Sequence, residues 1–195
     1  GVEVKIAHDG EILCKGPNVM MGYYKEEKMT QEVMSGDYFH TGDIGEVDDQ
    51  GFLKITDRKK EMFKTSGGKY IAPQVIESQM KQSLFIEQIM VVGAGRRMAT
   101  AIIQPNTDYV KNWLNENGIE CDSLSKAVQE PTLKKVIENE VEHHNQNFGS
   151  WEQVKKIELT PDEWSIDKGH LTPTMKLKRK VIAEKYNNLI DNMYQ

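Results

Sequence analysis

The stretch that decides the fold is Ile89-Met90-Val91-Val92-Gly93-Ala94-Gly95-Arg96-Arg97-Met98. Its apolar start has the length of a buried strand, and the two arginines follow soon after. A strand followed by Gly-x-Gly begins like a dinucleotide-binding fingerprint, but Met98 stands where the third glycine belongs, and a strand pattern follows instead of a helix. We therefore predict a hairpin turn between strands at Ile86–Val92 and Met98–Gln104.

The patterns after and around this hairpin predict a small α+β domain. Pro73 stands at the first turn of a predicted helix whose Val75, Ile76 and Met80 share one face. Further elements are predicted in this order: helices at Thr107–Asn117, Leu124–Gln129 and Thr132–Gln146, a strand at Val154–Leu159, and a basic amphipathic helix from about Arg179.

The residues before position 57 are rich in strand patterns. Val2, Val4 and Ile6 alternate with charged residues, as in a half-buried strand, and Glu11–Lys15 is predicted to return from it after a turn. A short helix at Lys25–Met34 and strands at Ile44–Val47 and Phe52–Ile55 complete this segment. The boundary between the two parts is predicted near residues 57–60.

Composition excludes several classes of protein. The 195 residues carry 25 basic and 30 acidic side chains, a formal net charge of −5, and 38% of them are hydrophobic. These values are typical of a folded domain rather than a disordered chain, and a mildly acidic balance argues against a dedicated nucleic-acid binder. No apolar run reaches the ~18 residues that a membrane span needs.

The cysteines and histidines indicate no disulfide framework and no metal site. Cys14 and Cys121 lie far apart and form no Cys-x-x-Cys pair, which favours a reducing, cytosolic compartment. The first residues follow a strand pattern rather than that of a signal peptide. His143 and His144 are adjacent on a predicted helix and so face different directions, which is poor geometry for one metal ion.

The triplet Thr41-Gly42-Asp43 is predicted to lie on a turn between two strand patterns. An ionised aspartate offers only acceptor oxygens, so one carboxylate can accept from both vicinal hydroxyls of a ribose. Gly42 would let the backbone approach a ligand closely. Taken alone, the triplet is more typical of an ordinary turn.

Two cationic stretches are candidate anion-binding sites. The first, Asp57–Lys69, combines several cations with the flexible Ser66-Gly67-Gly68 loop, which suits a phosphate-bearing ligand. The second, Leu171–Lys180, holds cations and no acidic residue. A solvated charge run is the alternative explanation of each.

The motifs gain specificity from their order along the chain. They include Gly10-Glu11-Ile12, Gly36-Asp37-Tyr38-Phe39-His40-Thr41-Gly42-Asp43, Asp57-Arg58-Lys59-Lys60, Pro73-Gln74-Val75-Ile76-Glu77, Trp151-Glu152-Gln153-Val154-Lys155-Lys156 and Leu171-Thr172-Pro173-Thr174-Met175-Lys176-Leu177-Lys178-Arg179. Nearly the whole chain thereby resembles the C-terminal third of AMP-forming acyl-CoA synthetases, a superfamily that includes luciferases and the adenylation domains of peptide synthetases. Within it, the last two motifs are similar to those of the long-chain fatty acid–CoA ligases.

This resemblance implies a two-step reaction that uses ATP and CoA. A fatty-acid carboxylate attacks the α-phosphate of ATP to give acyl-AMP and pyrophosphate, and the CoA thiol then displaces AMP. Asp43 matches the ribose-binding aspartate of the superfamily, Arg58 the arginine that contacts ribose and phosphate, and Lys176 the lysine that reaches the α-phosphate and the acyl carboxylate. A fixed ammonium there would offset charge that builds up in the transition state. Met175 stands where the superfamily commonly has glycine. Other long-chain members look similar to this chain at that position.

The resemblance also implies a domain rotation between the two steps. Lys60 falls at the hinge position of the superfamily, about which the small domain turns. The rotation would withdraw Lys176 and bring the Gly67-Gly68 loop to the active site. Lys64 matches the lysine that is used in this second conformation.

The implied fold class is α+β, in two parts. Residues 1–57 would be the end of a large N-terminal domain, the tail of a β-barrel-like subdomain, and residues 58–195 a small α+β C-terminal domain with a hinge at 58–60. The phosphate loop, the acyl tunnel and the Mg²⁺-binding glutamate of the superfamily have no counterpart here and would belong to the N-terminal domain. We therefore expect no adenylation by this chain alone.

Two alternatives stay open at this stage. A fatty acyl-AMP ligase, or another acid–thiol ligase of the superfamily, would differ in the acid and thiol that the full-length protein prefers. A non-enzymatic module would use the basic loops to bind nucleic acid or an anionic membrane surface, which the net charge of −5 opposes. The partners expected are fatty acid, ATP and CoA in a cytoplasmic protein. Peripheral membrane contact, oligomeric state and acyl chain length are left open.

Overall fold

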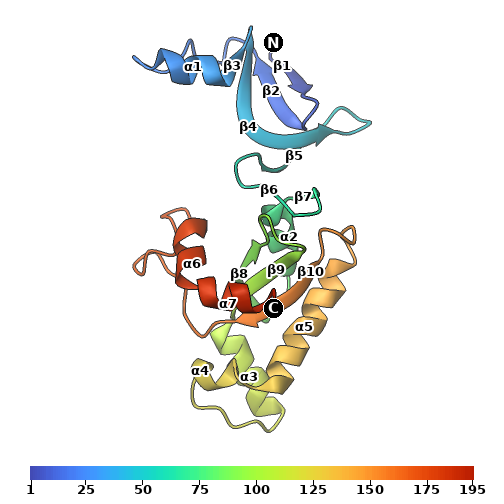
Figure 1. Ribbon diagram of the computed structural model, residues 1–195, viewed down its shortest axis with the longest axis vertical. Helices are drawn as coiled ribbons and strands as arrows, with labels where there is room; N and C mark the ends of the chain where they lie inside the picture. Colours follow the sequence, from blue (N-terminus) through green and yellow to red (C-terminus); the bar gives the residue numbers. More distant parts are fainter. The chain divides into compact units, whose positions relative to one another are not determined.

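The computed structural model describes all of residues 1–195 and divides the chain into an N-terminal unit, Gly1–Met62, and a C-terminal unit, Phe63–Gln195 (Figure 1). Helices and strands alternate along the chain without a single shared sheet, so the predicted α+β class is confirmed. No helix combines the length and the apolar character that crossing a membrane would require.

The N-terminal unit is an antiparallel sheet with one short helix. Its strands are β1 (Glu3–Ile6), β2 (Glu11–Lys15), β3 (Met34–Ser35), β4 (Tyr38–Val47) and β5 (Leu53–Arg58), and its helix is α1 (Glu27–Val33). The long strand β4 pairs with β2, β3 and β5 and curves strongly along its length, while β1 pairs only with β2 (Figure 1). The predicted hairpin of β1 and β2 is confirmed.

Two expectations for this unit are wrong. The strand over Val2–Ile6 is predicted to be half-buried, but every residue of β1 is exposed, because β1 is an edge strand over which nothing in the unit packs. The triplet Thr41-Gly42-Asp43 is predicted on a turn, but it lies inside β4, which begins at Tyr38 rather than at Ile44. Pairing with β2 on one side and β5 on the other extends the strand through the triplet.

The C-terminal unit is built on a three-stranded sheet. Its order is β10 (Val154–Leu159), β9 (Ala99–Pro105) and β8 (Ile86–Val92), with β8 antiparallel and β10 parallel to the central strand. The hairpin predicted between β8 and β9 is therefore confirmed. Every residue of β9 is buried, as expected for a central strand that is covered on both faces.

Helices cover the sheet, and a small hairpin precedes it. These elements are β6 (Phe63–Lys64), β7 (Tyr70–Ile71), α2 (Pro73–Met80), α3 (Thr107–Glu116), α4 (Leu124–Ala127), α5 (Pro131–Asn145), α6 (Arg179–Lys185) and α7 (Asn187–Asn192). Each predicted helix of this unit begins within one residue of its observed start. The last predicted helix is divided into α6 and α7 at Tyr186.

Side chains that alternate along β8 and β9 separate two apolar clusters. The larger cluster joins one face of the sheet to α2, α3 and α5. The smaller one lies on the other face, next to α6, and contains Met90, Ile102, Trp164, Leu171, Ile182, Tyr186 and Met193. Leu171 opens the loop that carries Lys176, so the start of this loop is anchored in a buried cluster.

Candidate functional site

Asp43 and Arg58 meet on neighbouring strands of the N-terminal unit. They are directly opposite in the register of β4 and β5, and Arg58 Nε lies 2.8 Å from Asp43 Oδ1. The side chain of Asp43 is 23% exposed and that of Arg58 56% exposed. The pair therefore presents carboxylate and guanidinium groups to solvent side by side, an arrangement that can bind hydroxyl groups and an anionic group of one ligand.

A bulge in β4 turns Asp43 into this position. Between Glu11 and Leu13 the strand β2 advances two residues, whereas β4 advances four, from Ile44 to His40. Gly42 lies within the bulge and has φ 74°, a left-handed conformation that glycine adopts without a steric cost. The sequence thus places the residue type best suited to this backbone directly before the aspartate.

Glu11 holds the bulge from the neighbouring strand. Its side chain is only 4% exposed; Oε1 accepts from the Gly42 amide at 2.9 Å, and Oε2 lies 2.8 Å from Lys59 Nζ and 2.7 Å from His40 Nδ1. Lys59 also pairs with Asp9 at 2.6 Å, and its amide donates to the Gly42 carbonyl at 2.8 Å. The backbone around Gly42 is therefore fixed from both sides.

The charges of this cluster stabilise one another. Burial alone would raise the pKa of Glu11, but hydrogen bonds from His40, Lys59 and the Gly42 amide outweigh it and hold that pKa below its ordinary value. The Lys59 ammonium likewise lowers the pKa of Asp9, and hydrogen bonds to Asp9 and Glu11 raise the pKa of Lys59. Glu11 thus remains an anion despite its burial.

Lys64, Gly67 and Gly68 belong to the tight hairpin of β6 and β7. Within its loop, Gly68 has φ 81° and its amide donates to the carbonyl of Thr65 at 2.9 Å. Lys64 is exposed, and its ammonium lies 5.4 Å from the centroid of the Tyr70 ring. The predicted Ser66-Gly67-Gly68 loop is therefore present.

The turn between β8 and β9 supports this hairpin. The Gly95 amide donates to the carbonyl of Lys64, and the Ser66 amide donates to the carbonyl of Arg96, each at 2.8 Å. The stretch that decides the fold therefore also fixes the loop that carries the two glycines.

Lys176 lies in a closed loop between the last strand and α6. The Thr172 amide donates to the Lys176 carbonyl at 2.8 Å, the Lys176 amide donates to Thr172 Oγ1 at 3.1 Å, and Leu171 and Leu177 form a bridge. Lys176 itself is exposed. Met175 has φ 61°, so the position where the superfamily commonly has glycine adopts a backbone that favours glycine.

A partly buried ion pair fixes the end of the same loop. Arg179, the first residue of α6, lies 2.6 Å from Glu77 Oε2 on α2 and donates to the Val91 carbonyl at 3.3 Å. Glu77 Oε1 in turn accepts from the Val91 amide at 2.7 Å. The pair links α2, β8 and α6 directly behind the loop.

Lys60 lies in the turn that follows β5. The amides of Glu61 and Met62 both donate to the carbonyl of Arg58, at 2.9 and 3.1 Å, and Lys60 is exposed between them. It belongs to the N-terminal unit, three residues before the start of the C-terminal unit.

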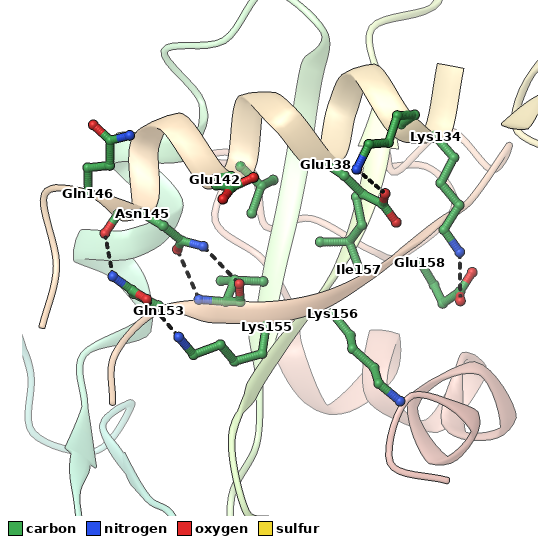
Figure 2. Close-up of a pocket in the computed structure, with 13 residues that line it drawn as sticks. Lys134, Glu138, Glu142, Asn145, Gln146, Gln153, Lys155, Lys156, Ile157 and Glu158 are labelled. Carbon is green, nitrogen blue, oxygen red and sulfur yellow. Dashed lines mark hydrogen bonds and ion pairs between the residues drawn. The ribbon is translucent and has the colours of Figure 1, made fainter. Parts of the chain in front are cut away.

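A pocket of about 630 Å³ lies between α5 and β10, away from every predicted site residue of the C-terminal unit (Figure 2). Its charges are largely paired: Lys134 lies 3.0 Å from Glu158, and Lys135 lies 3.9 Å from Glu138. The Asn145 side chain donates to the Val154 carbonyl at 2.8 Å and accepts from the Val154 amide at 3.0 Å. It thereby satisfies both backbone groups of the first residue of β10. No group of three or more His, Cys, Asp or Glu side chains in the structure could hold a metal ion.

Comparison with known proteins assigns the chain to a family. Residues 61–195 match the family model described as AMP-binding enzyme C-terminal domain. The chain belongs to this family. The resemblance described from the ordered motifs is therefore confirmed.

The chain has relatives that match all or nearly all of its length. It is 38% identical over all 195 residues to Long-chain-fatty-acid–CoA ligase FadD15 of Mycobacterium tuberculosis, and 38% identical over 190 residues, 95% of the chain, to Long-chain-fatty-acid–CoA ligase 1 of Homo sapiens. The chain spans 32% and 27%, respectively, of the length of these relatives.

Solved structures share the fold of the AMP-binding C-terminal domain. The A domain of the carboxylic acid reductase from Segniliparus rugosus, in complex with AMP and a co-purified carboxylic acid, matches with a TM-score of 0.80 at 20% identity, over 100% of this chain and 31% of that one. The anthranilate CoA ligase AuaEII in complex with anthranoyl-AMP matches with a TM-score of 0.67 at 18% identity, over 95% of this chain and 33% of that one.

Three residues that support the candidate sites of the chain have no role predicted from the sequence. Glu11 and Glu77 occur in the ordered motifs, and His170 directly precedes the last one. Each is less than 9% exposed and has a charged or polar partner far away in the sequence. An acidic residue next to a buried apolar position, as in Glu11-Ile12 and Ile76-Glu77, is the only signal that could have indicated the first two.

Proposed function

We propose that this chain is the C-terminal part of an AMP-forming long-chain fatty acid–CoA ligase. The complete protein would convert a fatty acid and ATP to acyl-AMP and pyrophosphate, and then acyl-AMP and CoA to acyl-CoA and AMP. The observation that carries this proposal is the 38% identity over all 195 residues to a long-chain-fatty-acid–CoA ligase. Residues 1–57 would close a larger domain, and residues 58–60 would form the hinge to the smaller one.

In the first step, Asp43 and Arg58 would bind the nucleotide. The Oδ2 atom of Asp43 can accept from the ribose hydroxyls while Oδ1 is paired with Arg58 at 2.8 Å. The terminal nitrogens of Arg58 would then donate to ribose or phosphate oxygens. The bulge held by Glu11 supports this role, because it fixes the carboxylate before any ligand arrives.

Lys176 would act in the same step on the reacting groups. Its ammonium stands on a loop that is closed by backbone hydrogen bonds and anchored by Leu171 and Arg179. A cation presented in this way can neutralise charge on the α-phosphate and the attacking carboxylate. The loop holds its base firmly and leaves the side chain exposed to reach a ligand.

In the second step, the hairpin of Lys64, Gly67 and Gly68 would replace Lys176 at the active site. A rotation about Lys60 suits a short turn in which the amides of Glu61 and Met62 both donate to the carbonyl of Arg58. The bare glycines would let the backbone pass close to the pantetheine arm of CoA. The proposal assigns no Mg²⁺ ligand to these residues and derives no step through a metal.

Replacement of one lysine in the full-length protein tests these assignments. Lys176→Ala should lower fatty-acid-dependent pyrophosphate exchange about 100-fold, since it removes a cation from the transition state of the first step. Thioester formation from supplied acyl-AMP and CoA should remain within about twofold. Lys135→Ala on α5, whose side chain is 70% exposed and pairs only with Glu138, is the matched control and should change neither rate.

Three outcomes would contradict the proposal. Equal losses in both half-reactions would remove the role given to Lys176. Fatty-acid-driven pyrophosphate exchange by the 195-residue chain alone would show that it does not depend on a larger domain. A full-length protein that prefers a short or aromatic acid, or a thiol other than CoA, would remain an acid–thiol ligase but not the long-chain ligase proposed.

A further inference from the structure

The ring of His170 is a buried titratable group at the base of the Lys176 loop. His170 is 4% exposed, and its carbonyl accepts from the Lys178 amide at 2.8 Å. One step further along the loop, Leu171 and Leu177 form a bridge. His170 and Lys178 are therefore the pair of residues that closes the loop.

A chain of polar contacts ties this ring to α6. Lys185 Nζ lies 3.3 Å from His170 Nε2 and 2.8 Å from Asp162 Oδ2, and the same carboxylate oxygen accepts from Tyr186 OH at 2.7 Å. His170 Nδ1 is buried and has no hydrogen-bond partner. Lys185 and Tyr186 lie at the end of α6, so the base of the loop is held to this helix through the imidazole.

The contact with Lys185 requires a neutral ring. An ammonium group only donates, so Nε2 can accept from it only when the imidazole proton resides on Nδ1. Protonation of the ring would remove this hydrogen bond and place a second cation 3.3 Å from Lys185. Lys168, on the loop before His170, adds another positive charge, and Asp162 is the carboxylate that opposes them.

Charge and burial act on the ring in the same direction. Burial, followed by the charge of Lys185, lowers the pKa of His170 below its ordinary value of 6.5. The imidazole therefore stays neutral near neutral pH, and the contact with Lys185 is intact there.

We propose that His170 is a positioning residue for the adenylate-forming step: its neutral ring, held by Lys185, fixes the base of the loop that presents Lys176. The inference rests on the role proposed for Lys176 and adds to it a residue that touches no substrate. Protonation of the ring frees the base of the loop, so adenylation slows in acid. Thioester formation, from which Lys176 is withdrawn, does not depend on this contact.

Two substitutions in the full-length protein separate positioning from simple structural support. His170→Phe keeps a ring but removes the acceptor, and is expected to lower pyrophosphate exchange about tenfold at neutral pH, with thioester formation from acyl-AMP within about twofold. In acid the difference from the unmodified protein should shrink, because protonation removes the same contact there. His170→Gln keeps an acceptor near the place of Nε2 and cannot be protonated. It is expected to retain the rate at neutral pH and to lose the acid decline of pyrophosphate exchange that is expected of the unmodified protein, whose His170 pKa is lowered by burial and Lys185.

A third substitution removes the other half of the contact. Lys185→Met takes away the donor to Nε2, so pyrophosphate exchange should fall about tenfold at neutral pH, as in His170→Phe, and no longer decline in acid. Thermal unfolding of each variant at neutral pH checks that the loss of rate does not come from an unfolded domain.

The outcomes distinguish this inference from the function on which it rests. If Lys176→Ala leaves pyrophosphate exchange unchanged, the proposed function fails, whatever His170 does. If Lys176→Ala is selective but His170→Phe lowers both half-reactions equally, or His170→Gln keeps the acid decline, the positioning role alone is overturned.

Discussion

The two units of the chain hold their candidate site residues in different ways. In the N-terminal unit Ile12 is the one buried hydrophobic residue, and the site is fixed by Glu11, Lys59 and a bulge. In the C-terminal unit the Lys176 loop is anchored in an apolar cluster through Leu171 and closed by an ion pair at Arg179. A polar network thus positions the carboxylate of Asp43, and a packed core positions the lysine.

The same difference appears on the surface of the N-terminal unit. Its exposed apolar side chains are numerous and lie on β1 and around β5: Val2, Val4, Ile6, Val47, Phe52, Leu53 and Ile55. Such a share of exposed apolar strand residues is unusual for a sheet that is complete in itself. Within the proposed function, these faces would be covered by the rest of a larger domain.

Truncation of one buried isoleucine in each unit should give the largest difference in stability between the two units. Ile103 on β9 is 0% exposed in the main cluster, so Ile103→Ala should lower the free energy of unfolding by about 3–5 kcal/mol through a cavity that cannot collapse. Ile12→Ala should cost only about 1–2 kcal/mol, because the surrounding side chains are exposed and can move.

Urea unfolding can follow the two units separately. The three tryptophans, Trp113, Trp151 and Trp164, all lie in the C-terminal unit, so tryptophan fluorescence monitors Ile103→Ala, and circular dichroism monitors Ile12→Ala. If both substitutions cost the same, the N-terminal unit would have a core that these burial values do not show.

The pH dependence of stability should separate the units next. As the pH falls below 6.5, His170 is protonated in the unfolded state before it is protonated in the folded state, because burial and Lys185 lower its pKa in the folded state. The C-terminal unit should therefore lose stability from about pH 6.5 downward. The pKa of Glu11 is also lowered, from an ordinary value of 4.5. Its contribution to the free energy of unfolding is therefore complete above pH 4.5 and is lost as the pH falls through the pKa of the folded state.

Melting temperatures measured in steps of pH check this order. Tryptophan fluorescence should report a decrease beginning near pH 6.5, and His170→Gln should remove that decrease. The decrease linked to Glu11 should begin near pH 4.5 and persist in His170→Gln. A fluorescence-detected stability that stays constant down to pH 4.5 would contradict the buried neutral imidazole.

The extent to which sequence predicts structure also differs between the units. Helix α2 begins at Pro73 as predicted, and both ends of helices α3 and α5 and of strand β8 are correct to within one residue. The bulge of β4 and the exposure of β1 did not follow from local periodicity, because they depend on which strands pair and on what covers them.

The partners of the site residues are less predictable still, because they are far apart in the sequence. Asp43 and Arg58 could be proposed from motif order, yet the contact of Glu11 with Lys59 spans 48 residues and that of Glu77 with Arg179 spans 102. No local pattern encodes such pairs. The candidate site residues can thus be proposed from the sequence, whereas the residues that hold them in place are found only in the structure.

The smallest expected effect concerns the backbone beside Lys176. Met175 has φ 61°, which costs a residue with a side chain about 1 kcal/mol, and it is exposed, so its side chain gains little from packing in return. Met175→Gly relieves the conformation but also gives the unfolded chain more freedom, so we expect a net stabilisation of at most about 0.5 kcal/mol in urea unfolding. The matched control is Met29→Gly on helix α1, which should destabilise by about 1 kcal/mol. If Met175→Gly destabilises as much as this control, the methionine side chain stabilises the loop by contacts of its own. The left-handed backbone at Met175 would then not lower the stability of the C-terminal unit.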